Sequence, residues 1–204
     1  MKTYISLLRG INVSSQNRIR IPELKQVYEL LKLVNVMTYI QSGNVIFDCE
    51  QQDPAPLARA IEAELERSFG FSIRILLRDK DRFQQIISDN PFINQRNEDP
   101  EKLYVTFLAE SPSESATSTL ILTNAGGGGR SNSGNSNLKM NPQRFGSGNT
   151  DEFVINDKEI YLFCSNGYGR TKLSTGFFER YLSFAATTRN WKTVNALFEI
   201  AHLR

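Results

Sequence analysis

The chain has 204 residues, enough for one large domain or two small ones, and its formal net charge of +2 is too small to indicate a general binder of polyanions. Its 40% hydrophobic and 23% charged residues are typical of a soluble globular protein. The first residues show no signal-peptide pattern and no apolar run reaches membrane length. We therefore expect a cytoplasmic protein that does not contact a membrane.

Residues that bind metals or activate nucleophiles are sparse. The one histidine is His202, and no HExxH or paired DxD pattern occurs, so we expect no metal site and no cofactor. Cys49 and Cys164 stand far apart without CxxC spacing, which favours buried or edge thiols over redox chemistry. No nucleophile with its base can be recognised, and whether the chain is an enzyme stays open.

The pattern of residues 1–79 predicts a small lobe that contains both strands and helices. "TYISLLR" is a compact β run, and apolar residues at helical spacing follow Pro22. "NVMTYIQSGNVIFDC" gives two β runs around a turn at Ser42-Gly43, and a second helix and a last strand follow. The resulting βαββαβ order is the split βαβ pattern of a ferredoxin-like domain.

Residues 80–204 predict a second α+β lobe that ends in helices. Ser111, Pro112 and Glu114 carry the pattern of a capping box at the start of a helix. The other expected elements are a helix over 80–90, a strand over 102–109, a hairpin over 151–164 and helices over 171–182 and 190–201. The fold class expected for the whole chain is therefore α+β with two small lobes.

Glycine, serine and asparagine dominate residues 124–150. Such a segment buries too little apolar surface to offset the entropy of ordering it. The GxxxxGK[ST] spacing of a phosphate-binding loop is missing, so we expect a flexible surface insertion within the second lobe.

The predicted topology of the first lobe collects polar residues along one rim of its sheet. Strands one and two should run parallel with strand three between them, so the loop "RGINVSSQNRIR" and the turn "QSGN" should meet. Two interpretations are open: the side chains satisfy the backbone of the turns, or they form a pocket for a carboxylate, phosphate or nucleobase edge. The residues concerned are Arg9, Asn12, Gln41, Ser42 and Asn44, with Arg18 and Arg20 near them.

A second candidate site lies in "NGYGRTKLSTGFFERYL". Arg170 and Lys172 would open a helix, where free N–H groups attract anions, although a tight turn with a capped helix explains the pattern without a ligand. Gly176 within this helix suggests close packing against a neighbour.

The stretch "TTRNWKTV" predicts a third helix start. Asn190 or Thr188 can cap the helix, and an apolar stripe begins at Trp191. Arg189 and Lys192 exceed what a cap needs, so an anion or a partner is the alternative to a purely structural role.

The combination "YISLLRGINV", "IPEL", "TYIQSGNVIF", "GYGRTKL" and "TTRNWKTV" resembles the bacterial family of domain of unknown function 1697. The resemblance spans residues 1–203, although residues 124–147 look longer and richer in glycine than the family's connection. It implies a cytoplasmic α+β protein without an assigned activity. The motif positions that carry over are Arg9, Gly10, Asn12, Gln41, Ser42, Gly43, Asn44, Gly169, Arg170, Lys172, Thr188, Arg189, Asn190 and Trp191.

Arginine and asparagine thus concentrate at expected loops and helix starts. The leading hypothesis is a binding module for an anionic ligand, namely a nucleotide, a nucleic acid or a phosphorylated metabolite. The alternatives are a small metal-independent enzyme that acts on an anionic metabolite, and a structural role in which these residues lock the lobes. The oligomeric state cannot be read from the sequence.

Overall fold

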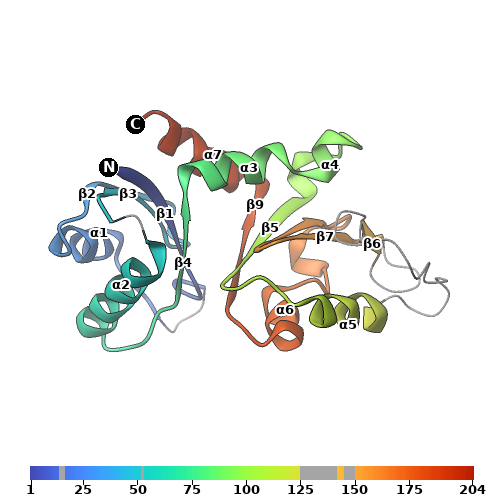
Figure 1. The fold of residues 1–204 in the computed structure, drawn as a ribbon, viewed down its shortest axis with the longest axis horizontal. Helices are drawn as coiled ribbons and strands as arrows, with labels where there is room; N and C mark the ends of the chain where they lie inside the picture. The colour runs from blue at the N-terminus through green and yellow to red at the C-terminus, as the bar shows by residue number, and fades with distance from the viewer. Residues whose placement is uncertain (14–16, 52, 125–141, 145–149) are drawn as a thin grey trace. The chain divides into compact units, whose positions relative to one another are not determined.

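The computed structural model describes residues 1–13, 17–51, 53–124, 142–144 and 150–204 (Figure 1). The chain divides into two compact units, one of Met1–Ile87 with Asn195–Arg204 and one of Ser88–Val194. The expected division into 1–79 and 80–204 differs from this, because most of the helix after residue 79 and the end of the last helix belong to the first unit.

The first unit contains a four-stranded antiparallel sheet in the order β2-β3-β1-β4. Strand β3 lies between β1 and β2 and runs antiparallel to both, so the predicted element order and the predicted neighbours of β3 are confirmed. The elements are β1 (Lys2–Leu8), α1 (Ile21–Leu30), β2 (Val34–Tyr39), β3 (Asn44–Cys49), α2 (Pro54–Phe69), β4 (Ile75–Asp79) and α3 (Lys80–Ser88).

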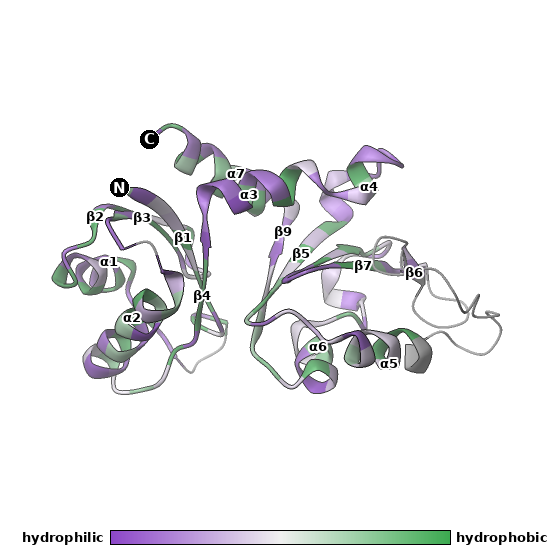
Figure 2. Cartoon of the chain, viewed as in Figure 1, coloured by the Kyte–Doolittle hydropathy of each residue, from purple (hydrophilic) through white to green (hydrophobic). Residues whose placement is uncertain are grey.

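Helices α1 and α2 pack against one face of this sheet. Leu24 and Tyr28 of α1, with Ile61 of α2, are fully buried in one cluster with Tyr4 and Phe47 from the strands. Both helices also carry hydrophilic residues along their length, as amphipathic helices do (Figure 2). This core holds the ends of β1 and β3 in place, and those ends carry the loops of the predicted rim.

The second unit contains a five-stranded antiparallel sheet in the order β6-β7-β8-β5-β9. Its core joins the sheet to α5 and α6 through buried residues such as Phe153, Leu162 and Phe178. The elements are α4 (Pro91–Asn94), the 3-10 helix η1 (Pro100–Lys102), β5 (Leu103–Leu108), α5 (Glu114–Asn124), β6 (Gln143–Arg144), β7 (Glu152–Asn156), β8 (Glu159–Phe163), the 3-10 helix η3 (Tyr168–Arg170), α6 (Thr175–Leu182) and β9 (Ala186–Asn190). Helix α7 (Trp191–His202) begins in this unit, and its residues from Asn195 onward belong to the first unit.

Strand β9 is the main element that the sequence reading missed. Its five residues pair with five of the six residues of β5, from Tyr104 opposite Asn190 to Leu108 opposite Ala186. The polar composition of Thr187–Asn190 suggested a helix cap, yet threonine is β-branched and fits a pleated strand well. Only the last residue, Asn190, acts as the expected cap of α7.

Two helix starts also differ from their predictions. Helix α6 begins at Thr175, where Ser174 Oγ accepts from Phe177 N at 3.2 Å, so Arg170 and Lys172 do not open a helix. A Cβ added to Gly176 would meet nothing within 4 Å, so the expected close packing there is wrong. Helix α5 is capped by Ser113, whose Oγ accepts from Ala116 N at 3.1 Å.

The expected insertion over 124–150 lies mostly outside the described residues, since 125–141 and 145–149 are not among them. Asn124 is the last residue of α5, and Gln143–Arg144 form strand β6, which pairs with Phe153 and Glu152 of β7. These three residues therefore belong to regular elements.

Candidate functional site

The nine predicted site residues fall into two groups, one in each unit. The first unit brings together the β1–α1 loop and the β2–β3 turn, which carry Arg9, Asn12, Gln41, Ser42 and Asn44. The second unit carries Arg170, Lys172, Arg189 and Asn190. We describe the two groups separately.

Asn12 joins the β1–α1 loop to the β2–β3 turn. Its Oδ1 accepts from Ile19 N at 2.9 Å, and its Nδ2 donates to Ile19 O at 3.1 Å and to Gln41 O at 2.9 Å. Asn12 adopts φ 55°, a left-handed conformation that asparagine tolerates better than most residues. The Asn12 amide is therefore occupied by backbone partners from two segments.

Gly43 brings the turn against the end of β1. Its carbonyl accepts from Leu8 N at 2.8 Å, and its φ of 75° lies in the left-handed region. A Cβ at this position would lie 2.7 Å from Ile11 Cδ1 and 2.8 Å from Leu8 Cβ. Only glycine fits both the conformation and the space.

Asn44 holds the turn from the other side. The residue is fully buried, and its Nδ2 donates to Tyr39 O and to Ser42 Oγ, each at 3.0 Å. Asn12 thus clamps the turn at Gln41, and Asn44 is a second clamp on the same turn. Asn12 contacts Gln41, and Asn44 contacts Ser42. Both asparagines also bond to backbone atoms, which is the first of the two interpretations of the rim.

An open hollow of about 1360 Å³ lies beside this clamp. Among its lining residues, Arg18 and Arg20 are exposed cations and Gln41 is an exposed amide. Arg20 Nη1 lies 3.7 Å from Glu23 Oε1, a long ion pair whose side chains are 85% and 49% exposed. Exposed ion pairs of this kind contribute little to stability, so the guanidinium group of Arg20 stays accessible to a ligand. The guanidinium group of the exposed Arg18 is accessible as well.

The hollow also surrounds the first turn of α1. Ile21, Pro22 and Glu23 line it, and the N-cap residue Arg20 supplies no side-chain hydrogen bond to the helix. By contrast, Asp53 caps α2 through a 2.9 Å bond to Ala55 N. The start of α1 therefore adds uncapped peptide dipoles to the arginine charges.

Arg9 lies outside the residues that line this hollow. Its side chain is exposed, and its backbone N–H donates to Arg74 O at 2.9 Å. The sequence predicted Arg9 as a residue of the rim, with Arg18 and Arg20 only near it. The structure gives these two arginines the more central position.

In the second unit, Arg189 is a buried residue of strand β9. Its Nη1 donates to Thr187 Oγ1 at 2.7 Å and to Thr188 O at 3.0 Å, and 8% of the residue is exposed. Burial lowers the pKa of the guanidinium to about 10, so the group still carries its charge at neutral pH. Arg189 is part of the packed interior and has little surface to offer a ligand.

The other residues of this group lie at the surface. Asn190 Oδ1 accepts from Thr193 N at 2.7 Å and so caps α7. Arg170 ends the short helix η3, and Arg170, Lys172 and Lys192 are all exposed.

A chain of hydroxyl groups connects β5, β9 and α6, and the only signal for it in the sequence is the threonine content. Thr188 Oγ1 lies 2.8 Å from Thr106 Oγ1 and 2.7 Å from Thr175 Oγ1. Tyr168 continues the chain, because its hydroxyl lies 3.1 Å from Thr175 Oγ1 and accepts from Thr175 N at 2.9 Å. These contacts hold strand β9 to β5 and α6, and the hydroxyl groups serve as partners for one another.

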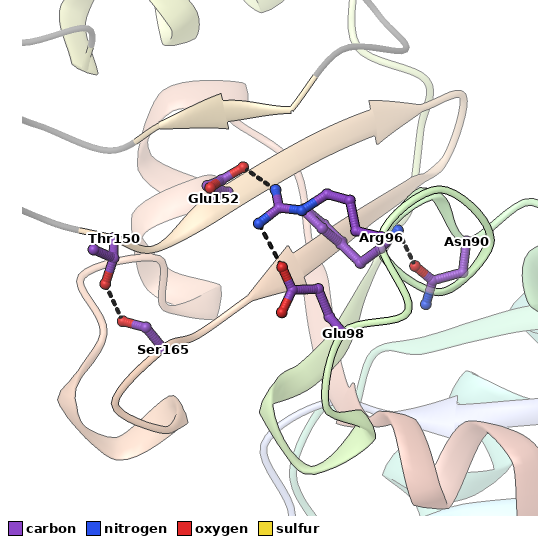
Figure 3. Close-up of polar contacts among 7 residues, drawn as sticks. Asn90, Arg96, Glu98, Thr150, Glu152 and Ser165 are labelled. Carbon is purple, nitrogen blue, oxygen red and sulfur yellow. Dashed lines mark hydrogen bonds and ion pairs between the residues drawn. The ribbon is translucent and has the colours of Figure 1, made fainter.

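Arg96 forms a separate polar cluster in the second unit (Figure 3). Its guanidinium binds Glu152 at 2.6 Å and Glu98 at 2.5 Å, and it lies 5.6 Å from the ring centroids of both Phe92 and Phe163. The hydrogen bond to Glu152 raises the pKa of Arg96. With two carboxylates and two rings as partners, this arginine fastens the segment after α4 to β7 and β8.

Burial raises the pKa of the Cys164 thiol to about 12, which disfavours the thiolate, and both cysteines are free. Among the described residues, no three histidine, cysteine, aspartate or glutamate side chains are grouped so that they could hold a metal ion. None of the described helices is both long enough and apolar enough to cross a membrane.

Comparison with known proteins places this α+β chain in a family. The model of the family described as "Protein of unknown function (DUF1697)" matches residues 1–129, and the chain belongs to this family. Its fold is similar to the solved structure of the conserved bacterial protein SP0830 from Streptococcus pneumoniae, with a TM-score of 0.70, 20% sequence identity and 98% of each chain covered. A search of curated proteins finds no match.

Proposed function

We propose that the protein is a binding module for a small anionic ligand, such as a nucleotide or a phosphorylated metabolite, and that the hollow beside the Asn12 clamp is its site. The observation that carries the proposal is the pair of exposed guanidinium groups, Arg18 and Arg20, in a concave surface next to an exposed amide. Guanidinium groups present forked donors that match carboxylate and phosphate oxygens.

The charge along the sequence supports this location. Residues 1–22 include Arg9, Arg18 and Arg20 but no aspartate or glutamate, and the first acidic residue is Glu23. The positive charge is therefore local, although the whole chain has a net charge of only +2. The uncapped start of α1 adds its dipole in the same hollow.

The small number of cations favours a small ligand over a long nucleic acid. A strand that contacts two phosphates through the two arginines would lose affinity with salt at a slope of about −1.4, because each phosphate contributes about −0.7 for single strands. Extended nucleic-acid surfaces neutralise several more phosphates than this.

Other parts of the proposal concern the fold and its setting. The order β2-β3-β1-β4 with βαββαβ connectivity supports a ferredoxin-like class for the first unit. We place the protein in the cytoplasm of a bacterium, in line with its free cysteines and its family resemblance. For Arg189, Asn44 and Asn190, the hydrogen bonds to neighbouring groups favour the structural alternative.

The test is a titration of the whole chain with pyrophosphate, AMP and a single-stranded oligonucleotide at two salt concentrations. Calorimetry measures the binding in each titration. We expect pyrophosphate or AMP to bind, and the double variant Arg18→Gln/Arg20→Gln to lose at least about 1.5 kcal/mol, or about tenfold in affinity. Arg59→Gln is the matched control, because Arg59 is an exposed arginine of α2 in the same unit that does not line the hollow.

Two results would contradict the proposal. Absence of binding by all three probes at low salt would remove the anion site. Equal affinity of the double variant and the wild type would move the site away from Arg18 and Arg20.

A further inference from the structure

The hydrogen bonds of the Asn12 side-chain amide distinguish it from a group that contacts a ligand. Among the described residues, the three hydrogen bonds of this amide go to backbone atoms, two to Ile19 and one to Gln41. An amide has two N–H donors and one carbonyl acceptor, and here each of these functions has a backbone partner within 3.1 Å. Little hydrogen-bonding capacity is left for a ligand.

We infer that Asn12 is a positioning residue, which assembles the hollow before any ligand arrives by tying the arginine-bearing loop to the β2–β3 turn. The inference rests on the proposed function, because it names what keeps that site in shape. Ile19, which Asn12 holds through both N–H and carbonyl, stands directly between Arg18 and Arg20. The backbone carbonyl of Gln41 accepts from Asn12, and Gln41 contributes an exposed amide to the lining of the hollow.

The surrounding backbone explains why the tie needs asparagine. Asn12 has φ 55°, and its own N–H donates to Asn17 O at 3.2 Å. Asparagine and glycine are the residues that adopt this conformation most readily, and of these two only asparagine carries an amide. An arginine pair fixed in this way loses less conformational entropy on binding than a pair on a free loop, which raises affinity without any additional ligand contact.

The same loop provides a matched control. Asn17 also has a left-handed backbone, with φ 54°, and its side chain is exposed. Asn12→Gly and Asn17→Gly therefore remove the same side chain from the same type of backbone conformation. Among the described contacts, only the first substitution unties the loop from the turn.

The experiment titrates both variants and the wild type with pyrophosphate and AMP, at a temperature at which circular dichroism shows all three to be folded. We expect Asn12→Gly to weaken binding by about tenfold and Asn17→Gly to change it by less than about twofold. Hydrogen exchange is the second readout, and the Ile19 amide should exchange at least about tenfold faster in Asn12→Gly alone, because that amide donates to Asn12 Oδ1.

The outcomes separate this inference from the proposed function. Unchanged affinity of Asn12→Gly, with binding by the wild type intact, overturns the positioning role and leaves the anion site standing. Faster exchange of Ile19 without any loss of affinity overturns it as well, because the tie then does not serve the site. If the wild type binds neither probe, the proposed function fails and the positioning role fails with it.

Asn12→Ser gives a second way to test the inference if the glycine variant does not fold. Serine keeps a short hydroxyl group near Ile19 but cannot span the distance to Gln41 O. We expect its affinity to fall between those of the wild type and Asn12→Gly. Affinity equal to that of the wild type counts against the link to the turn.

Discussion

The rim of the first unit and strand β9 of the second unit share a composition but use it in opposite ways. Both combine arginine with asparagine and short hydroxyl side chains. In the rim, the asparagines hold the backbone while Arg18 and Arg20 remain exposed in a hollow. In β9, Arg189 itself is buried and bonded to Thr187. The difference shows that burial and partners assign the role of an arginine, and the sequence motif alone does not.

The sharpest way to break this comparison is to remove the buried arginine. Arg189→Ala should lower the free energy of unfolding by about 2–3 kcal/mol, because it takes away a packed, hydrogen-bonded side chain of an edge strand. Urea denaturation measures the effect, and Arg170→Ala, at an exposed position of η3, should stay within about 0.5 kcal/mol. A loss of pyrophosphate affinity in Arg189→Ala without a loss of stability would instead place Arg189 in a ligand site.

Two glycines sharpen the comparison within the rim. Gly43→Ala should lower the free energy of unfolding by about 2 kcal/mol, since alanine at φ 75° is strained and its Cβ would overlap Ile11 and Leu8. Gly10 has φ 70° but nothing within 4 Å of an added Cβ, so Gly10→Ala should cost only about 1 kcal/mol. Thermal or urea unfolding compares the two variants, and equal costs would show that the contact with Ile11 and Leu8 relaxes freely.

The smallest expected effect is a gain in stability at the turn. Ile40 is a β-branched residue with φ 53°, which is an unfavourable conformation for its side chain, and it is 49% exposed. Ile40→Asn should therefore raise the free energy of unfolding by about 0.5–1 kcal/mol, whereas Ile40→Val keeps the branched Cβ and should change it little. Reduced stability of Ile40→Asn would reveal that the exposed side chain makes contacts that outweigh the backbone strain.

Topology made the rim predictable from sequence. Once the βαββαβ order is recognised, the crossover through α1 places the loop after β1 beside the turn between β2 and β3, and Asn12 does contact Gln41 there. The sequence could not show whether Asn12 and Asn44 contact a ligand or the backbone, because both uses need the same amide. It also ranked Arg9 above Arg18 and Arg20, since distance along a loop says little about which side chain lines a hollow.

Strand β9 shows where the reading of the second unit failed. Five residues are too few for a clear alternation, and polar Thr187 and Thr188 masked a strand that is paired along its whole length. The helix after it was predicted well, because Trp191, Val194 and Leu197 repeat at helical spacing and all three are buried. Asn190 satisfied both patterns, being the last residue of the strand and the cap of the helix.

The direct junction between β9 and α7 has a consequence for how this segment tolerates insertions. The strand ends at Asn190 and the helix begins at Trp191, with no connecting residue between them. One inserted amino acid would turn the apolar stripe of α7 by about 100° relative to Asn190, since a helix has about 3.6 residues per turn. Trp191 and Val194 would then leave their buried positions. The junction between strand and helix should therefore not tolerate the insertion or deletion of a single residue.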